Sequence, residues 1–121
     1  MQYMLLIATP ETSIQALAPA DIQKVMEAYM RFNQEATAAG VLLGSARLRP
    51  TSTATTVPVK DGKTIATDGP FAETKEQLGG YYLIDVKDLD EALRWAAKIP
   101  SARFGGIEVR PVWPQEEYMR K

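Results

Sequence analysis

Strand–helix–strand order occurs twice in this chain, and this repetition constrains the fold more than any other feature. Residues 3–7 and 81–86 are short apolar runs. The first run is too short for a core helix and predicts a strand buried on both faces, and the second predicts another strongly apolar strand. A helical pattern follows each run, and a further extended segment follows each helix, at residues 41–48 and 107–112. This order predicts an α+β fold of the ferredoxin-like, split βαβ kind.

Both helices carry recognisable end signals. Pro19 suits the first helical position, and Gly40 is a natural end for a helix of about five turns. One face of this helix holds most of the apolar side chains, with Met30 and Phe32 at its margins: Ile22, Val25, Met26, Tyr29 and Ala36. The second helix begins with the capping pair Asp88 and Glu91 and ends before Pro100. Its predicted buried stripe is Leu89, Ala92, Leu93 and Ala96, with Trp95 off the stripe.

A hairpin arm is predicted between the two units. Residues 51–67 are rich in Thr and Val with period-two alternation. Asp61-Gly62 is a strong hairpin turn signal between polar strands at 53–60 and 63–67. Residues 11–15 are polar and predict a loop. The whole chain, 1–121, is expected to be a single domain with an ordered core at about 1–113 and a tail at 114–121.

Counting the covering layers predicts the assembly. Two helices can cover only one face of the sheet, so alternate residues of the two apolar strands would leave apolar side chains on the other face. Such a patch generally marks an interface. We therefore expect a homodimer in which two sheets pack face to face and close into a dimeric α+β barrel.

Composition excludes several kinds of chemistry and of partner. The chain has no His and no Cys, which excludes an imidazole base, a thiolate nucleophile and the usual zinc sites. The formal net charge is −1, so the charge pattern of a nucleic-acid or anionic membrane surface is missing. No run approaches the ~20 apolar residues of a membrane span. We expect a cytoplasmic protein that uses neither a cofactor nor a metal.

Asp68 is the first candidate for a site. As a carboxylate beside a Gly-Pro turn it could act as a general base or bind a ligand, or it could cap its own backbone in the turn. Gly69 and Pro70 shape the loop, and Phe71 is expected to anchor it in the core. Glu73, Lys75 and Glu76 either orient an anionic substrate or form a solvated turn.

The other candidates lie on the predicted helix and strands. Tyr29 either offers a phenol to a ligand or fills the core. Arg47 and Arg110, with Glu108 beside Arg110, either bind a carboxylate or form an ion-pair cluster at the dimer seam. Tyr81 and its neighbour Tyr82 point to opposite faces of one strand, so only one of them can line a given cavity. We expect Trp95 and Trp113 to cover an interface or the tail.

Several motifs in order resemble one known family. Asp68-Gly69-Pro70-Phe71, followed by residues 72–76 and by Gly79-Gly80-Tyr81-Tyr82, looks like the YCII-related family and, within it, the DGPF-domain branch. The resemblance extends to residues 39–42, 90–92 and 108–112, and so covers nearly the whole chain. It implies the dimeric α+β barrel fold. It also implies relatives that act on small aromatic or lactone compounds, and a genomic context beside sigma factors.

The same resemblance implies a site that this chain does not keep. The wider family is proposed to use a His-Asp pair near the first helix. Alignment on Gly40 places those two positions at or near Tyr29 and Ala38, so the pair is missing here.

Two classes of function remain open at this point. One is the binding of a small polar or aromatic metabolite, with or without cofactor-independent catalysis, in a cleft between the sheet, residues 68–76 and Tyr29. The other is a non-catalytic partner linked to transcription, for which a sigma-factor-related protein is the expected partner.

Overall fold

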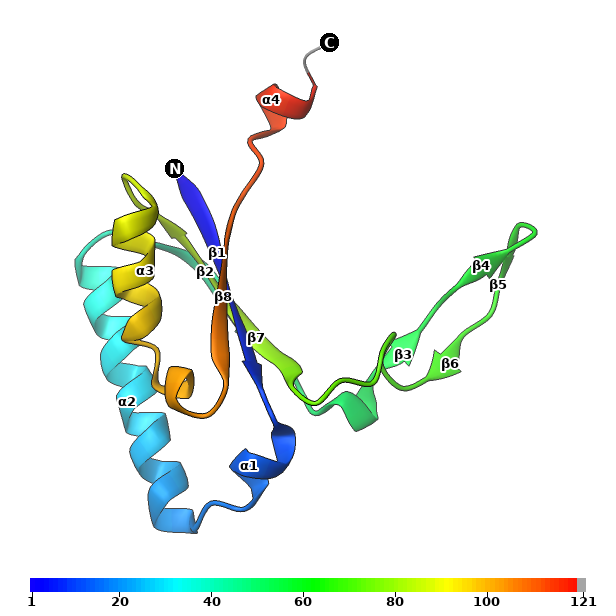
Figure 1. Ribbon diagram of the computed structural model, residues 1–121, viewed down its shortest axis with the longest axis horizontal. Helices are drawn as coiled ribbons and strands as arrows, with labels where there is room; N and C mark the ends of the chain where they lie inside the picture. Colours follow the sequence, from blue (N-terminus) through cyan, green and yellow to red (C-terminus); the bar gives the residue numbers. More distant parts are fainter. Residues whose placement is uncertain (120–121) are drawn as a thin grey trace.

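The computed structural model, which describes residues 1–119, contains a four-stranded antiparallel sheet (Figure 1). The strands lie in the order β2-β7-β1-β8. Their bounds are Leu42–Arg47 for β2, Gln77–Asp85 for β7, Gln2–Thr9 for β1 and Gly106–Pro111 for β8. This is the predicted ferredoxin-like split βαβ topology, and the two apolar strands β1 and β7 occupy its centre as expected.

Two helices cover one face of this sheet (Figure 1). Helix α2 (Pro19–Ala38) and helix α3 (Leu89–Ala97) keep close to their predicted bounds. The Asp88 side chain caps α3 by accepting a hydrogen bond from the Glu91 N–H at 2.9 Å, and Glu91 Oε2 accepts one from the Lys87 N–H at 3.1 Å. A short 3-10 helix, η2 (Pro100–Arg103), leads from α3 into β8.

The core lies between these helices and the sheet. Tyr3, Leu5 and Ile7 of β1 and Ile84 of β7 are buried there, and Phe32 of α2 is 3% exposed. The prediction that placed Phe32 at the margin of α2 was wrong. Helix α3 packs beside α2, so the buried stripe of α2 faces the gap between the sheet and α3.

Trp95 and the leucines of α3 also differ from expectation. The Trp95 ring lies edge-on to Phe32, with centroids 6.0 Å apart, and it packs against the core. Leu89 and Leu93 are instead about half exposed. Contact with α2 therefore rotates α3, so Trp95 joins the core in place of these two leucines.

Residues 11–15 form a helical turn, α1 (Glu11–Gln15), and the predicted loop was wrong. Glu11 holds this turn in place. Its N–H donates to Gln77 Oε1 at 2.8 Å, and its carboxylate accepts hydrogen bonds from the backbone N–H and the hydroxyl of Thr51. Both partners are distant in the sequence, so local patterns could not reveal them.

The arm, residues 51–76, is present as predicted. After η1 (Thr51–Thr53), β3 (Thr55–Thr56) pairs with β6 (Thr67–Asp68), and β4 (Val59–Lys60) pairs with β5 (Lys63–Thr64). Asp61 and Gly62 turn the hairpin with φ of 52° and 74°, the left-handed values that such a turn requires. The ladders are shorter than predicted because Pro58 has no N–H to donate.

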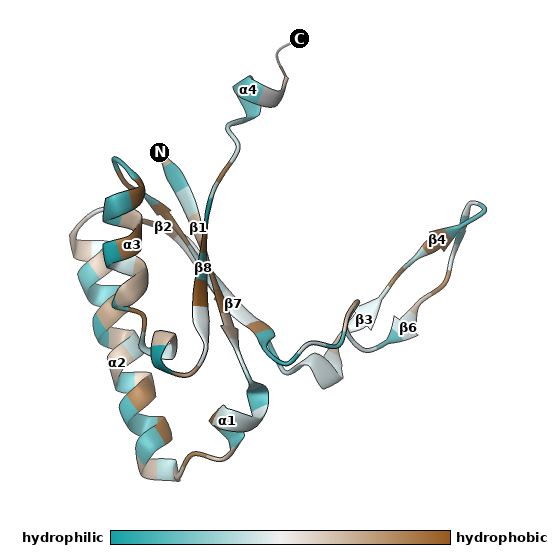
Figure 2. Cartoon of the chain, in the orientation of Figure 1, coloured by the Kyte–Doolittle hydropathy of each residue, from teal (hydrophilic) through white to brown (hydrophobic). Residues whose placement is uncertain are grey.

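Within residues 1–119 no helix lies on the second face of the sheet, which we call the open face (Figure 1). Strand pairing places Leu6 opposite Tyr81 and Met4 opposite Leu83 on this face. All four are partly exposed, so both strands are fully buried on one face only, and for β1 this corrects the expectation of burial on both faces. Figure 2 shows the hydrophobic character of the central strands and of part of the arm.

The C-terminal segment leaves the sheet after β8 and forms the short helix α4 (Gln115–Tyr118) (Figure 1). Residues 120 and 121, part of the predicted tail, lie outside the described residues. None of the helices within residues 1–119 combines the length and the apolarity needed to cross a bilayer.

Candidate functional site

A cavity of about 470 Å³ lies between α1, the N-terminal half of α2 and the helix-covered face of the sheet. Its wall is mainly apolar and includes Ile14, Leu17, Ile22, Val25, Met26 and Met30. Of these, Met30 is 60% exposed. The same helix packs tightly on the sheet only further along, at Phe32 and Ala36. The apolar residues of its first half therefore line the cavity where the sequence placed them in the core.

Tyr29 supplies a phenol to this cavity, and its partner is Ser101. The two hydroxyls share a hydrogen bond, and Ser101 is 6% exposed in η2. Burial raises the pKa of Tyr29, against the opposing effects of hydrogen bonding to Ser101 and of the Arg47 charge. Tyr29 is therefore a neutral hydrogen-bonding group at physiological pH and a poor base.

Tyr82 is the second phenol in the cavity wall. Its hydroxyl donates to Asn33 Oδ1 at 2.6 Å, and its ring centroid lies 4.7 Å from the ring centroid of Phe32. Burial, with a smaller effect of nearby Tyr29, raises the pKa of Tyr82 to about 12. Both phenols are thus held neutral and oriented by partners within the chain.

Arg47 brings a positive charge to the same cavity. It lies at the end of β2, and its nearest polar contact is weak, from Nη1 to Met26 Sδ at 3.7 Å. Within residues 1–119 no carboxylate forms an ion pair with it. The guanidinium is therefore free to take an anionic group from a ligand.

The structure brings together two of the candidates predicted from the sequence, Tyr29 and Arg47. Tyr81 lies on β7 at the edge of the cavity, but its pairing with Leu6 places its side chain on the open face. Arg110 is also on the open face, opposite Met4, with its Nε 3.5 Å from Glu108 Oε2. Both partners of this ion pair are exposed, so it contributes little to stability.

The segment around the Asp-Gly-Pro-Phe turn lies outside the cavity wall. Asp68, Glu73 and Lys75 are exposed, and the Asp68 carboxylate makes no hydrogen bond within residues 1–119. Phe71 was expected in the core and is 92% exposed. That expectation was wrong because the arm projects from the body and offers no core of its own at this position.

Two polar residues of the candidate site, Asn33 and Ser101, were not identified from the sequence. Asn33 lies four residues after Tyr29, on the same helical face, and this spacing could have identified it. No sequence pattern marks Ser101, because its contact with Tyr29 depends on how η2 packs against α2.

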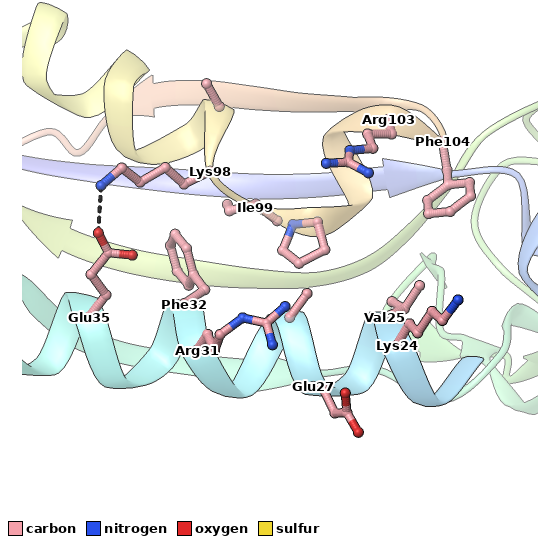
Figure 3. A pocket seen from close by; sticks show the side chains of 13 residues that line it. Lys24, Val25, Glu27, Arg31, Phe32, Glu35, Lys98, Ile99, Arg103 and Phe104 are labelled. Atoms are coloured by element: carbon pink, nitrogen blue, oxygen red, sulfur yellow. Dashed lines mark hydrogen bonds and ion pairs between the residues drawn. The ribbon is translucent and has the colours of Figure 1, made fainter. Parts of the chain in front are cut away.

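A second, larger groove of about 640 Å³ runs between α2 and the α3–η2 segment (Figure 3). Lys98 Nζ pairs with Glu35 Oε1 at 2.7 Å there and lies 4.8 Å from the Trp95 ring centroid. Basic and acidic side chains are mixed along its rim: Lys24, Glu27, Arg31 and Arg103. The first cavity is the better candidate because apolar walls and oriented polar groups converge in it.

Comparison with known proteins gives three findings. The family model described as the YCII-related domain matches residues 1–116. An uncharacterized protein of Rhizobium meliloti (strain 1021) is 42% identical over 114 residues, which cover 93% of this chain and 92% of that protein. A solved structure of 5-chloro-2-hydroxyhydroquinone dehydrochlorinase from Burkholderia phenoliruptrix AC1100, in complex with 2,5-dihydroxybenzoquinone, aligns with a TM-score of 0.49 and 11% identity. That alignment covers 97% of this chain and 98% of the other.

Proposed function

The chain belongs to the YCII-related family, as its motifs predicted, and we propose that it binds a small aromatic metabolite that carries an acidic group. The proposed site is the cavity between α1, α2 and the sheet. One observation carries this proposal: an apolar wall, two oriented neutral phenols and an unpaired guanidinium meet in one cavity. A relation to the DGPF branch is also part of the proposal and rests on Asp68-Gly69-Pro70-Phe71.

The size and lining of the cavity support this ligand class. Small-molecule sites commonly measure ~300–1,000 Å³ and are lined by apolar side chains with a few placed polar groups. A volume of about 470 Å³ suits a molecule of one or two rings. Met26 and Met30 can adapt to its shape, because methionine side chains are flexible and polarizable.

The polar groups support an acidic substituent on the ligand. Arg47 can bind a carboxylate with two parallel hydrogen bonds. Tyr29 and Ser101 can share a further hydrogen bond with a hydroxyl or carbonyl group, since each hydroxyl both donates and accepts.

The same residues favour binding over acid–base catalysis by the chain itself. The chain has no His, and burial raises the pKa of both phenols, so neither is ionised near neutral pH. The carboxylate in the cavity wall, Glu11, already accepts two hydrogen bonds from Thr51, so a ligand would be oriented and desolvated without a free base beside it.

A homodimer forms part of the proposal. The open face presents Met4, Leu6, Tyr81 and Leu83, which one chain alone leaves partly exposed. A second copy packed sheet to sheet would cover them and would complete the barrel that the family resemblance implies.

Binding is tested by thermal shift and calorimetry with benzoate, salicylate and their neutral amides. We expect the acids to stabilise the protein and the amides to bind at least about tenfold more weakly, since only the acids pair with a guanidinium. Arg47→Gln should lose this preference, and Arg94→Gln, on the exposed side of α3, should keep it. Asp68→Asn in the same panel tests the sequence-based candidate. The absence of any stabilising compound, or equal loss in the two arginine variants, would contradict the proposal.

A second candidate function is that of an interaction protein, and the exposed apolar residues of the arm favour it. Val57, Val59 and Ile65 are all at least half exposed. A sigma-factor-related partner stays a prediction, which a pull-down with the arm deleted as control would test.

A further inference from the structure

We infer that the arm is a clasp that holds a second copy of this chain, with Phe71 as its anchor. The inference rests on the homodimer of the proposed function and goes beyond it. It assigns a role to Asp68-Gly69-Pro70-Phe71, a motif that the cavity does not use.

The first step is the exposure of the arm's apolar residues. Phe71 is 92% exposed, Val59 is 65% exposed, and Val57 and Ile65 are exposed by half or more. Single exposed apolar residues are ordinary, but four exposed apolar side chains on one narrow arm favour a surface that covers them.

The second step is that, beyond its base, where Thr51 is bound by Glu11, the arm is held mainly by its own short ladders. Its ladders consist of two residue pairs each, Thr55–Asp68 with Thr56–Thr67 and Val59–Thr64 with Lys60–Lys63. An isolated hairpin of this kind is marginal in water. An arm with a fixed conformation therefore needs a further surface to pack on.

The third step concerns how the turn presents Phe71. The Gly69 N–H donates to Ala54 O at 2.7 Å, and Thr56 Oγ1 donates to Gly69 O at 2.7 Å. Gly69 has a φ of 101°, which favours glycine, and Pro70 fixes the next φ. The first three residues of the motif thus have restricted backbone angles, and the Phe71 ring that follows them lies outside the core of its own chain.

The fourth step identifies the occupant as a second copy. The arm leaves the sheet from β2, returns through β7, and projects on the side opposite α2 and α3 (Figure 1). The open face with Met4 and Leu83 looks to that same side. A copy packed on the open face by a two-fold axis would lie beside the arm, and symmetry would give each copy the other's arm.

Charge does not oppose this association. The arm carries three lysines and four acidic residues, and the whole chain has a net charge of −1. Two copies therefore meet with almost balanced charge, and apolar contact decides the outcome.

Photo-crosslinking tests the inference directly. Phe71→p-benzoylphenylalanine in the full chain is expected to give a covalent product of twice the monomer mass on irradiation, with crosslinked peptides from β1, β7 or β8 of the other copy. Leu83→p-benzoylphenylalanine, on the open face, serves as the positive control for the dimer itself. Leu93→p-benzoylphenylalanine, on the outer side of α3, serves as the negative control.

The outcomes separate this inference from the proposals on which it rests. A crosslink at position 83 without one at 71 overturns the clasp and leaves the dimer standing. A monomer mass by light scattering, with no crosslink at either position, overturns both. Ligand binding is measured separately and does not depend on either result.

A matched pair of substitutions gives a second readout. Phe71→Ala should raise the dimer dissociation constant at least about tenfold, as expected for loss of an aromatic anchor. Lys75→Ala changes another exposed side chain of the same segment and should leave that constant within about twofold. Equal constants for the two variants, with circular dichroism unchanged, would overturn the role given to Phe71.

Discussion

Tyr29 and Ser101 show how a single hydrogen bond can join the candidate site to the stability of the fold. Ser101 is buried in η2, and its hydroxyl is paired with the phenol of Tyr29 on α2. The bond ties the 3-10 helix to the long helix at the edge of the cavity. Removal of the phenol oxygen would leave a buried hydroxyl without a partner, which costs more than the bond itself contributes.

Tyr29→Phe is therefore predicted to lower the free energy of unfolding by about 1–3 kcal/mol. Ser101→Ala should cost less, because the Tyr29 hydroxyl that remains faces the cavity and can reach water. Urea unfolding of both variants and of the double variant measures the coupling between the two side chains. If the effects of the single changes simply add, the hydrogen bond makes no net contribution and the prediction fails.

At the residue scale, the sequence identified only those polar residues of the cavity whose side-chain type is itself unusual, such as a tyrosine or an arginine. Tyr29 and Arg47 were identified as candidates, and they meet at one cavity. Ser101 is one of many small polar residues, and only the packing of η2 against α2 distinguishes it. Phe71 was misplaced because an aromatic ring in a turn is ordinarily buried by its own chain, whereas this turn stands on an arm.

At the scale of the elements, close backbone approach governs the pairing of β2 with β7. A Cβ added at Gly80 would lie 2.6 Å from Ala46 O, whereas one added at Gly79 would have its nearest neighbour, Ile7 O, at 3.9 Å. The first distance is a clash with backbone, and the second is an ordinary contact. The two adjacent glycines therefore form a matched pair for testing the sheet.

Gly80→Ala is predicted to destabilise the protein by about 1–3 kcal/mol, because strand β2 must shift to admit the methyl group. Gly79→Ala should change the free energy of unfolding by less than about 1 kcal/mol. Chemical denaturation of the two variants under the same conditions compares them. Equal effects would show that the β2–β7 approach is looser than the structure has it.

The cap of α3 is a second feature at this scale. Asp88→Ala removes the acceptor for the Glu91 N–H and should cost about 0.5–2 kcal/mol. Asp90→Ala is the control, since Asp90 lies in the first turn and makes no capping hydrogen bond. Thermal unfolding should show a clearly larger loss for Asp88→Ala. A larger loss for Asp90→Ala would mean that charge near the helix end matters more than the cap.

The elements themselves were largely predictable, whereas their rotation was not. Periodicity, Pro19, Gly40 and Asp88 located both long helices, and Asp61-Gly62 located the hairpin turn. The rotations of α2 and α3 could not be predicted, because they depend on the mutual contact between Phe32 and Trp95. Helix α1 was not predicted for a similar reason. Glu11 is held by Thr51 and Gln77, which lie 40 and 66 residues away in the sequence.

At the scale of the whole molecule, one face of the sheet is covered by helices and the other is not. The ligand-binding proposal concerns the covered face, and the dimer proposal concerns the open face. The covered face holds the core and, beside the N-terminal half of α2, the candidate cavity. The open face and the arm hold apolar residues that a single chain does not bury. Counting layers from the sequence predicted this division, because two helices can cover only one face of a four-stranded sheet.

The stability of the whole fold should also depend on alkaline pH, through Tyr82. The folded protein holds the Tyr82 phenol with a pKa of about 12, whereas an unfolded tyrosine has a pKa near ~10. Below pH ~10 both states keep the proton, and the full stability is present. As the pH rises from ~10 to ~12 the unfolded chain releases its proton and the folded chain does not, so the free energy of unfolding falls, by about 2–3 kcal/mol in all.

Urea unfolding at a series of alkaline pH values, followed by circular dichroism, measures this fall, and tyrosinate absorbance reports ionisation in the folded protein. Tyr82→Phe is the control. It should be less stable at neutral pH by about 1 kcal/mol, because the hydrogen bond to Asn33 is lost. Its stability should also decline less over the same alkaline range, since one perturbed phenol has been removed and Tyr29, whose pKa is raised in the same direction, remains. Equal declines in the two proteins would show that the Tyr82 phenol is not the group that burial protects from ionisation.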